Sequence, residues 1–166
     1  KDVMSLRDGV KFSPQFIENK LKFSPYIKEA VTVGHNRDFI IALICIDFGI
    51  VGNWAERNKI NYTTYTDLSS KPEVYGLIQR EVEKVNKGLP ENAKVKRFAL
   101  LYKELDPDDD ELTRTRKVRR HFVEEKYKEI IEGMYEGKDT IKIEAVIKFQ
   151  DGKTSTIRTV IAVRNV

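Results

Sequence analysis

The chain has 166 residues, enough for one domain with a buried core of its own. Apolar residues make up 40% and charged residues 34%, which excludes a disordered chain, and no run approaches the roughly 20 consecutive apolar residues of a membrane span. The net charge of +4 is too small to imply nucleic-acid binding by itself.

The first residue and the single cysteine bear on the origin of the chain. Because it begins with Lys1 rather than methionine and no apolar leader follows, we expect a piece of a longer protein. Cys45 allows no internal disulfide and lies in an apolar run, so we expect a buried thiol. A reducing, cytoplasmic location follows, with a peripheral position at a membrane surface as the alternative. No cysteine–histidine cluster has metal-ligand spacing, so we predict no metal site.

In chain order, the pattern of apolar residues predicts a mixture of strands and helices. Ser13 and Pro14 suit the N-cap and the first position of a helix, and Pro25 stops it. Residues 38–47 are apolar on both faces, which is typical of a central strand. Pro72 begins a longer helix with an apolar stripe. We expect strands at residues 1–6, 29–34, 38–47 and 95–105, helices at 14–23, 50–60, 72–87 and 118–134, and a loop at 61–70.

The tail changes character after Gly137. Apolar and polar residues alternate at 141–149 and at 157–163, and Asp151-Gly152 lies between these two segments. Alternation on both sides of Asp-Gly predicts a β-hairpin. The sequence therefore indicates an α+β fold, a small mixed sheet flanked by helices, with residues 1–137 as the main domain and residues 138–166 as a β-hairpin extension.

Two segments are the candidates for chemistry. Residues 8–18 contain a turn at Gly9 and then the capped helix. The second segment is Glu111-Leu112-Thr113-Arg114-Thr115-Arg116-Lys117-Val118-Arg119-Arg120, which follows the acidic run 106–111 directly. A flexible loop with a cation near its tip could deliver that charge into a partner site. Each segment also has a purely structural explanation, a turn before a helix and a solvated charged stretch.

The order and separation of these segments resemble the C-terminal domain of AMP-forming adenylating enzymes. Residues 9–18 read Gly-x-x-x-x-Pro-x-x-Ile-Glu, and residues 112–120 read Leu-Thr-x-Thr-x-Lys-Val-x-Arg before a helix, about a hundred residues later. Residues 14–27 look like the long-chain acyl-CoA synthetases in particular. The resemblance covers residues 1–135 and leaves the hairpin out.

This resemblance implies that residues 1–137 are the C-terminal lid domain of an ATP-dependent long-chain fatty-acid–CoA ligase. Such enzymes convert a fatty acid, ATP and CoA to acyl-CoA, AMP and pyrophosphate through an acyl-adenylate. It also implies that ATP, Mg²⁺ and the acyl chain bind to an N-terminal domain of the same polypeptide. CoA and the fatty acyl-adenylate would be the other partners, and the fragment alone would bind no cofactor tightly and be inactive.

The second motif carries the adenylation residues of the family. Lys117 matches the lysine whose ammonium stabilises the charge that develops where the carboxylate attacks the α-phosphate. Arg120 matches the arginine that follows it and is expected to support rather than catalyse. Two positions depart from the family pattern. Many relatives have glycine where Arg116 stands, and long-chain relatives often have proline where Arg114 stands.

The first motif carries the residues of the thioester step. Gly9 matches the glycine of the loop that faces the active site when CoA attacks, where a residue without a side chain lets backbone approach the pantetheine arm closely. The resemblance places Val10 and Lys11 beside this CoA passage. Lys1 falls at the hinge, where a few backbone torsions absorb the rotation of the domain.

Two other functions are compatible with the residues alone. Five cations within residues 114–120 could contact the phosphates of a nucleic acid or another anionic surface. However, no aromatic residue interleaves these cations, and the acidic run before them would repel a polyanion. A structural interaction domain could instead use an edge of the hairpin for a partner. Among these functions we expect that of the ligase domain, and we expect the chain to bind no nucleic acid.

Overall fold

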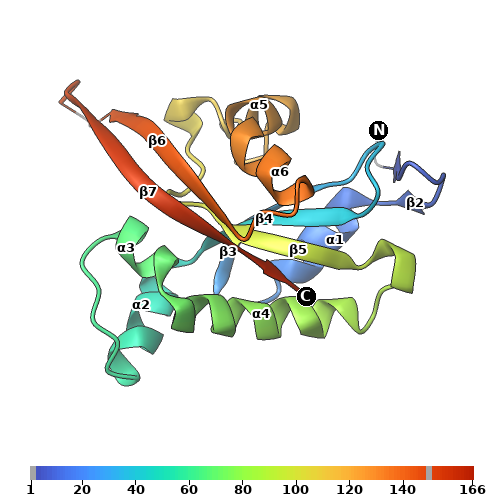
Figure 1. Ribbon diagram of the computed structural model, residues 1–166. Helices are drawn as coiled ribbons and strands as arrows, with labels where there is room; N and C mark the ends of the chain where they lie inside the picture. Colours follow the sequence, from blue (N-terminus) through green and yellow to red (C-terminus); the bar gives the residue numbers. More distant parts are fainter. Residues whose placement is uncertain (1–2, 149–150) are drawn as a thin grey trace.

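The structure, a computed structural model, describes residues 3–148 and 151–166 (Figure 1). A five-stranded sheet has the strand order β3-β4-β5-β7-β6, and a two-stranded ribbon, β1-β2, lies apart from it. The strands are β1 (Met4–Ser5), β2 (Lys11–Phe12), β3 (Ile27–Val33), β4 (Ile40–Ile46), β5 (Val95–Leu100), β6 (Thr140–Lys148) and β7 (Thr154–Asn165). The helices are α1 (Pro14–Leu21), α2 (Phe48–Arg57), α3 (Tyr65–Ser70), α4 (Pro72–Asn86), α5 (Arg120–Lys126) and α6 (Lys128–Tyr135), with 3-10 turns at Glu91–Ala93 and Pro107–Asp109.

Strand β4 lies inside the sheet, antiparallel to β3 and parallel to β5. All of its residues are buried, because alternate side chains point to opposite faces and both faces are covered. Ala42 and Ile44 belong to one hydrophobic cluster, whereas Leu43 and Cys45 belong to the other. The prediction of a central strand is confirmed. Burial raises the pKa of the Cys45 thiol to about 12, so the thiol stays protonated.

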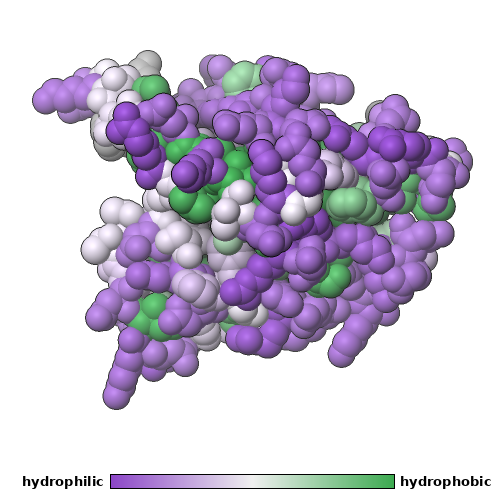
Figure 2. Space-filling view, viewed as in Figure 1, coloured by the Kyte–Doolittle hydropathy of each residue, from purple (hydrophilic) through white to green (hydrophobic). Residues whose placement is uncertain are grey.

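Helices form a layer on each face of the sheet (Figure 1), and the surface seen in Figure 2 is mostly hydrophilic, with smaller hydrophobic areas. α1, α2 and α4 lie on one face, and α4 places Val74, Ile78 and Val82 toward the sheet at intervals of four residues. α5 and α6 lie on the other face, where Val123 and Met134 are fully buried. The mixed sheet between these layers confirms the predicted α+β fold. In the described part of the chain, no helix has the length and apolar character needed to cross a membrane.

The predicted hairpin is confirmed, and its second strand also completes the sheet. β7 pairs antiparallel with β5 on one side and with β6 on the other. The hydroxyl of Tyr75 in α4 donates to the carbonyl oxygen of Ala162 in β7 at 2.8 Å. Arg97 of β5, only 6% exposed, donates to the carbonyl oxygens of Met134 at 2.6 Å and Lys138 at 2.9 Å. A domain boundary after residue 137 stays a proposal.

Three predicted elements differ from the structure. Residues 61–70 contain helix α3, whose N-cap hydroxyl, on Thr64, accepts from the amide of Asp67 at 3.1 Å. The single helix predicted at 118–134 is two helices, because the backbone leaves helical geometry at Tyr127, with φ −103° and ψ 24°. β5 ends at Leu100 rather than at residue 105. Phe149, which we expected at the end of the first hairpin strand, lies outside the described residues.

Candidate functional site

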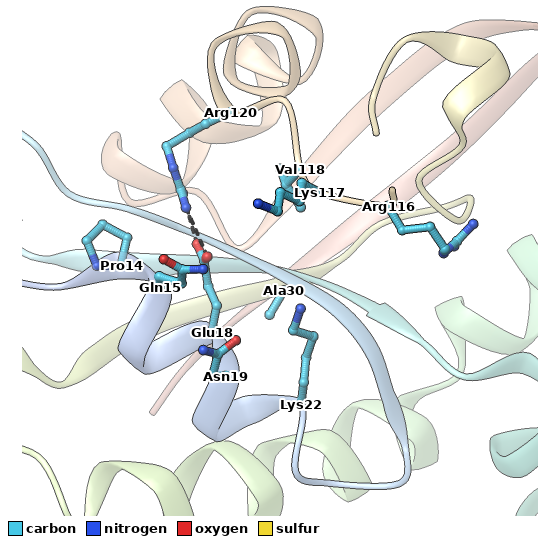
Figure 3. Close-up of a pocket in the computed structure, with 10 residues that line it drawn as sticks. All are labelled: Pro14, Gln15, Glu18, Asn19, Lys22, Ala30, Arg116, Lys117, Val118 and Arg120. Atoms are coloured by element: carbon cyan, nitrogen blue, oxygen red, sulfur yellow. Dashed lines mark hydrogen bonds and ion pairs between the residues drawn. The ribbon is translucent and has the colours of Figure 1, made fainter. Parts of the chain in front are cut away.

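The two sequence motifs meet at a partly buried ion pair. Arg120, the first residue of α5, donates from Nη1 and Nη2 to the two carboxylate oxygens of Glu18 in α1, at 2.8 and 2.9 Å (Figure 3). Glu18 is only 6% exposed. Two parallel hydrogen bonds between a guanidinium and a carboxylate fix both the distance and the orientation of the partners. The last residue of each motif therefore holds the two motifs together.

Strand β3 completes this ion pair. Oε2 of Glu18 also accepts from the backbone amide of Thr32 at 2.7 Å and from its hydroxyl at 3.0 Å. Arg120 donates a further hydrogen bond to the carbonyl oxygen of Thr32, at 3.1 Å. Burial disfavours the charge on Arg120, but the hydrogen bonds and charge of Glu18 outweigh it, so the pKa of Arg120 lies above its ordinary value. Arg120 thus bridges α1, β3 and α5 as a permanent cation.

Lys117 lies in a tight loop that Leu112 and Val118 close with an antiparallel bridge. The amide of Thr113 donates to the carbonyl oxygen of Lys117 at 2.8 Å, and the amide of Lys117 donates to the Thr113 hydroxyl at 3.0 Å. These bonds fix the backbone at Lys117. Its side chain is exposed, and no carboxylate of the described residues forms an ion pair with it. The backbone is therefore held, while the ammonium remains available to another molecule.

A buried carboxylate anchors the base of this loop. Glu111 is fully buried and accepts from Nζ of Lys103 at 2.6 Å, from the amide of Asp106 at 2.9 Å, and from the Tyr127 hydroxyl. Nζ of Lys126 lies 2.8 Å from Oε2 of Glu111, the oxygen to which the Tyr127 hydroxyl donates. Two cations and two further donors offset the desolvation of the carboxylate. Burial, together with Glu111, raises the pKa of Tyr127, which stays protonated as a donor. The acidic run thus ties the loop to α5 and α6.

Arg116, directly before Lys117, has an unusual backbone conformation. Its φ is 65°, in the left-handed region, where a residue with a Cβ is strained by roughly 1–2 kcal/mol. The loop requires this conformation because the amide of Arg116 closes the turn on the carbonyl oxygen of Thr113, at 2.8 Å. Glycine adopts the same torsions without strain. The structure therefore gives a physical reason for the glycine that we associate with this position.

Replacing Arg116 by glycine should stabilise the chain by up to about 1 kcal/mol, because the relief of backbone strain exceeds the added flexibility of the unfolded state. Urea unfolding would measure this as a higher midpoint with an unchanged slope. Arg114→Gly is the matched control, since it removes an arginine from the same loop at a position without positive φ. Equal effects of the two variants would show that the strain at Arg116 is not relieved.

A pocket of about 260 Å³ opens between α1 and residues 116–120 (Figure 3). Figure 3 shows Lys117 on the loop and Lys22 at the end of α1 on opposite sides of it, while the side chain of Arg116 extends to one side. The Arg120–Glu18 ion pair forms part of the wall. The lining residues are Pro14, Gln15, Glu18, Asn19, Lys22, Ala30, Arg116, Lys117, Val118 and Arg120. The structure thus brings the predicted residues Lys117 and Arg120 to one pocket.

The residues predicted for the thioester step lie elsewhere, because none of them lines this pocket. Gly9 has a φ of 92°, and its amide donates to the carbonyl oxygen of Leu6 at 2.9 Å, so it forms an exposed turn. Val10 packs partly buried against the core, whereas Lys11 is exposed on β2. A Cβ added at Gly9 would have no neighbour within 4 Å. The predicted hinge, Lys1, lies outside the described residues.

Three residues of the candidate site received no role in the sequence analysis. Glu18 stands in the first motif, and its acidic character was visible, but its partner was not. Glu111 stood in a run of charged residues that gave no sign of burial. Lys22 follows the helix that Ser13 caps and reaches the pocket only because α1 packs beside the loop. Within the described residues, no group of three or more His, Cys, Asp or Glu side chains could hold a metal ion.

Comparison with models of known protein families shows the family of this domain. The model of the AMP-binding enzyme C-terminal domain matches residues 1–139. The chain therefore belongs to the family of AMP-binding enzyme C-terminal domains. The match contains both motifs and ends before the part of the chain that forms the hairpin.

The relatives are considerably longer than this chain. Long-chain-fatty-acid–CoA ligase FadD15 of Mycobacterium tuberculosis is 32% identical over 136 residues, which cover 81% of this chain and 23% of the relative. Long-chain-fatty-acid–CoA ligase ACSBG2 of Gallus gallus is 29% identical over 158 residues, which cover 84% of this chain and 21% of the relative. The chain thus spans less than a quarter of the length of these relatives.

Solved structures show the same fold. The adenylation domain of a carboxylate reductase from Mycobacterium chelonae superposes with a TM-score of 0.64 at 20% identity, over 81% of this chain and 19% of that chain. A didomain of a carboxylic acid reductase from Segniliparus rugosus, in complex with AMP, gives a TM-score of 0.65 at 16% identity, over 82% of this chain and 18% of that chain. At this level of identity the likeness establishes the fold.

Proposed function

We propose that this chain is the mobile C-terminal domain of an AMP-forming long-chain fatty-acid–CoA ligase. The complete enzyme would convert a fatty acid, ATP and CoA to acyl-CoA, AMP and pyrophosphate. Membership of the family and the names of the relatives support this function. The observation that carries it is Lys117, an exposed ammonium without an ion pair among the described residues, on a loop whose base is anchored by the buried Glu111.

Lys117 would act in the first half-reaction. A carboxylate oxygen of the fatty acid attacks the α-phosphorus of ATP, and the bond to the β-phosphate oxygen breaks, so that pyrophosphate leaves. Negative charge concentrates on the oxygens around the α-phosphorus in the transition state. The ammonium of Lys117 pairs with these oxygens, and its fixed backbone limits the reorganisation needed. Arg120 supports the loop through Glu18 rather than contacting the substrate.

The remaining participants belong to the part of the enzyme outside this chain. ATP, Mg²⁺ and the acyl chain would bind to an N-terminal domain of the same polypeptide, in line with the short share of the relatives that this chain spans. The domain would turn about Lys1 so that the loop at Gly9, Val10 and Lys11 faces CoA and the acyl-adenylate in the second half-reaction. We place the enzyme in the cytoplasm and expect no nucleic acid as a partner.

Replacing Gly9 by leucine should slow thioester formation at least about tenfold and largely spare adenylation, because a branched side chain would block the narrow passage of pantetheine. A Cβ at Gly9 has no neighbour within 4 Å in this domain, so the added side chain meets no clash there, and the φ of 92° lowers stability without favouring either step. A step-selective loss would therefore come from contact with another domain or with CoA. Single-turnover assays of each half-reaction, in a protein that joins this chain to its ATP-binding domain, would measure it.

Gly9→Ala is the matched control. Because the φ of Gly9 is 92°, alanine should cost roughly 1 kcal/mol of stability from the backbone alone. If Gly9 only forms the turn, both half-reactions stay otherwise intact. If it lines the passage for pantetheine, the thioester step is slowed selectively, and more by leucine than by alanine. If leucine and alanine both lower stability and neither affects one step more than the other, the thioester role of this loop is wrong.

The chain alone, incubated with ATP, Mg²⁺, fatty acid and CoA, should release no pyrophosphate.

A further inference from the structure

We propose that the pocket between α1 and residues 116–120 binds a phosphate-bearing ligand that carries at least two negative charges, such as a diphosphate or a phosphate monoester. The ligand class follows from the wall of the pocket, and only the identification of its source with the ligase reaction rests on the proposed function. Lys117 lines this pocket and would also act on the α-phosphate of ATP, which would bind to the N-terminal domain, whereas the pocket belongs to this chain alone.

The first argument is the balance of charge in the wall. Four cationic side chains line the pocket, and the only carboxylate among the lining residues is Glu18. That carboxylate is already saturated by Arg120 and by Thr32. Arg116 and Lys117 are exposed, and no described carboxylate forms an ion pair with either. The wall therefore keeps uncompensated positive charge, which favours an anion.

Lys22 adds a third cation that can turn toward a ligand. Its Nζ forms an ion pair with the buried Glu29 at 3.4 Å, and its side chain remains 35% exposed, so a ligand would share this cation with Glu29. Figure 3 shows its ammonium on the α1 side of the pocket, across from Lys117. An anion between them would be held from both walls by charge-assisted hydrogen bonds.

The neutral lining residues favour an oxygen-rich ligand over an apolar one. Gln15 and Asn19 stand one turn apart on the exposed face of α1, and their amide groups offer N–H donors. Only Pro14, Ala30 and Val118 contribute apolar surface. The volume of about 260 Å³ has room for more than one phosphate group, since a water molecule occupies roughly 30 Å³. A phosphate-bearing group fits this wall, whereas a fatty acyl chain does not.

Two sources of such a group follow from the proposed function, and the experiment separates them. Pyrophosphate leaves in the first half-reaction, and CoA brings a nucleotide with a 3′-phosphate to the second. The probes are inorganic pyrophosphate and 3′,5′-ADP, titrated into the chain at low ionic strength by calorimetry. Amide chemical shifts of residues 15–22 and 116–120 would locate the binding. The tighter probe identifies the source.

Lys22→Gln should weaken binding of the tighter probe about tenfold, because one charge-assisted hydrogen bond is lost. Lys20→Gln is the matched control, with the same change of charge two residues earlier, inside α1. Its Nζ lies over the rings of Phe16 and Phe23, at 5.4 and 6.0 Å from their centroids, and it does not line the pocket. This control should change the affinity less than twofold.

The proposal would be overturned if neither probe bound, or if the two variants weakened binding equally, since the latter would indicate general attraction to a basic surface. Thermal melts of both variants would confirm that each is folded. The outcome is independent of the proposed function, because this assay measures binding by the chain alone. If the pocket binds pyrophosphate but Lys117 proves dispensable for adenylation, the proposed phosphate site stands and the proposed role of Lys117 in adenylation is wrong.

Discussion

Replacing Lys117 by alanine should lower the rate of adenylation at least about 100-fold in a protein that joins this chain to its ATP-binding domain. The lost interaction is one that an ammonium makes chiefly with charge that develops in the first transition state. Thioester formation from a preformed acyl-adenylate should be nearly unchanged, because that step does not create the same charge. Pyrophosphate release in a single turnover measures the first step, and acyl-CoA formation measures the second.

Arg114→Ala provides the control for this experiment. Arg114 is exposed in the same loop, on the other side of Thr115 and Arg116 from the motif lysine, and it does not line the pocket. Its removal changes the net charge of the loop equally, so a general electrostatic effect would appear in both variants. Equal losses in both half-reactions, or no loss in either, would show that Lys117 is an ordinary surface lysine.

Replacing Arg120 by alanine should lower the free energy of unfolding by about 3 kcal/mol, because the buried carboxylate of Glu18 would lose its cation. The amide and hydroxyl of Thr32 would still donate to that carboxylate, which keeps the loss toward the lower end of the usual range. Urea unfolding followed by circular dichroism would measure the change.

The control variant is Arg119→Ala. Arg119 is the neighbouring arginine, and it pairs with Asp110 at 3.5 Å where both side chains are well exposed, at 47% and 69%. Such a pair contributes about 0–1 kcal/mol. Adding Glu18→Ala to Arg120→Ala should cost much less than the sum of the single changes, since the charge left unpaired is removed with its partner. Strict additivity of the two changes would contradict a coupled pair.

Local signals predicted most of the fold. The Ser13–Pro14 pair marked the start of α1, the two-sided apolar run marked β4, and Asp151-Gly152 marked the hairpin, because capping, burial and turn chemistry each depend on a few adjacent residues. α3 was missed because only Leu68 and Ser69 of its six residues are buried, too few for a periodic signal. The break at Tyr127 had no local sign either, since its hydroxyl bonds to Glu111, sixteen residues away.

The sequence predicted which motifs form the candidate site but not which of their side chains contact one another. The spacing of the motifs indicated the family, which the match to residues 1–139 established. The contact between Glu18 and Arg120 spans 102 residues, and no periodicity reports which distant charge meets which. In a sequence with 30 basic and 26 acidic residues, the number of possible pairs is large. Only the fold selects this one, because it brings α1 and the first residue of α5 together at the edge strand β3.

The position of β7 has a consequence for the order in which the sheet can form during synthesis. β7 follows all the other described strands in the sequence, yet it lies between β5 and β6 rather than at an edge. Until it arrives, one side of β5 is an open edge and the apolar surface of β6 has no neighbour in the sheet. Unpaired edges of this kind favour association between nascent chains. The last of the described strands therefore closes the sheet, and cellular factors that shield β-edges would act on this chain before β7 is synthesised.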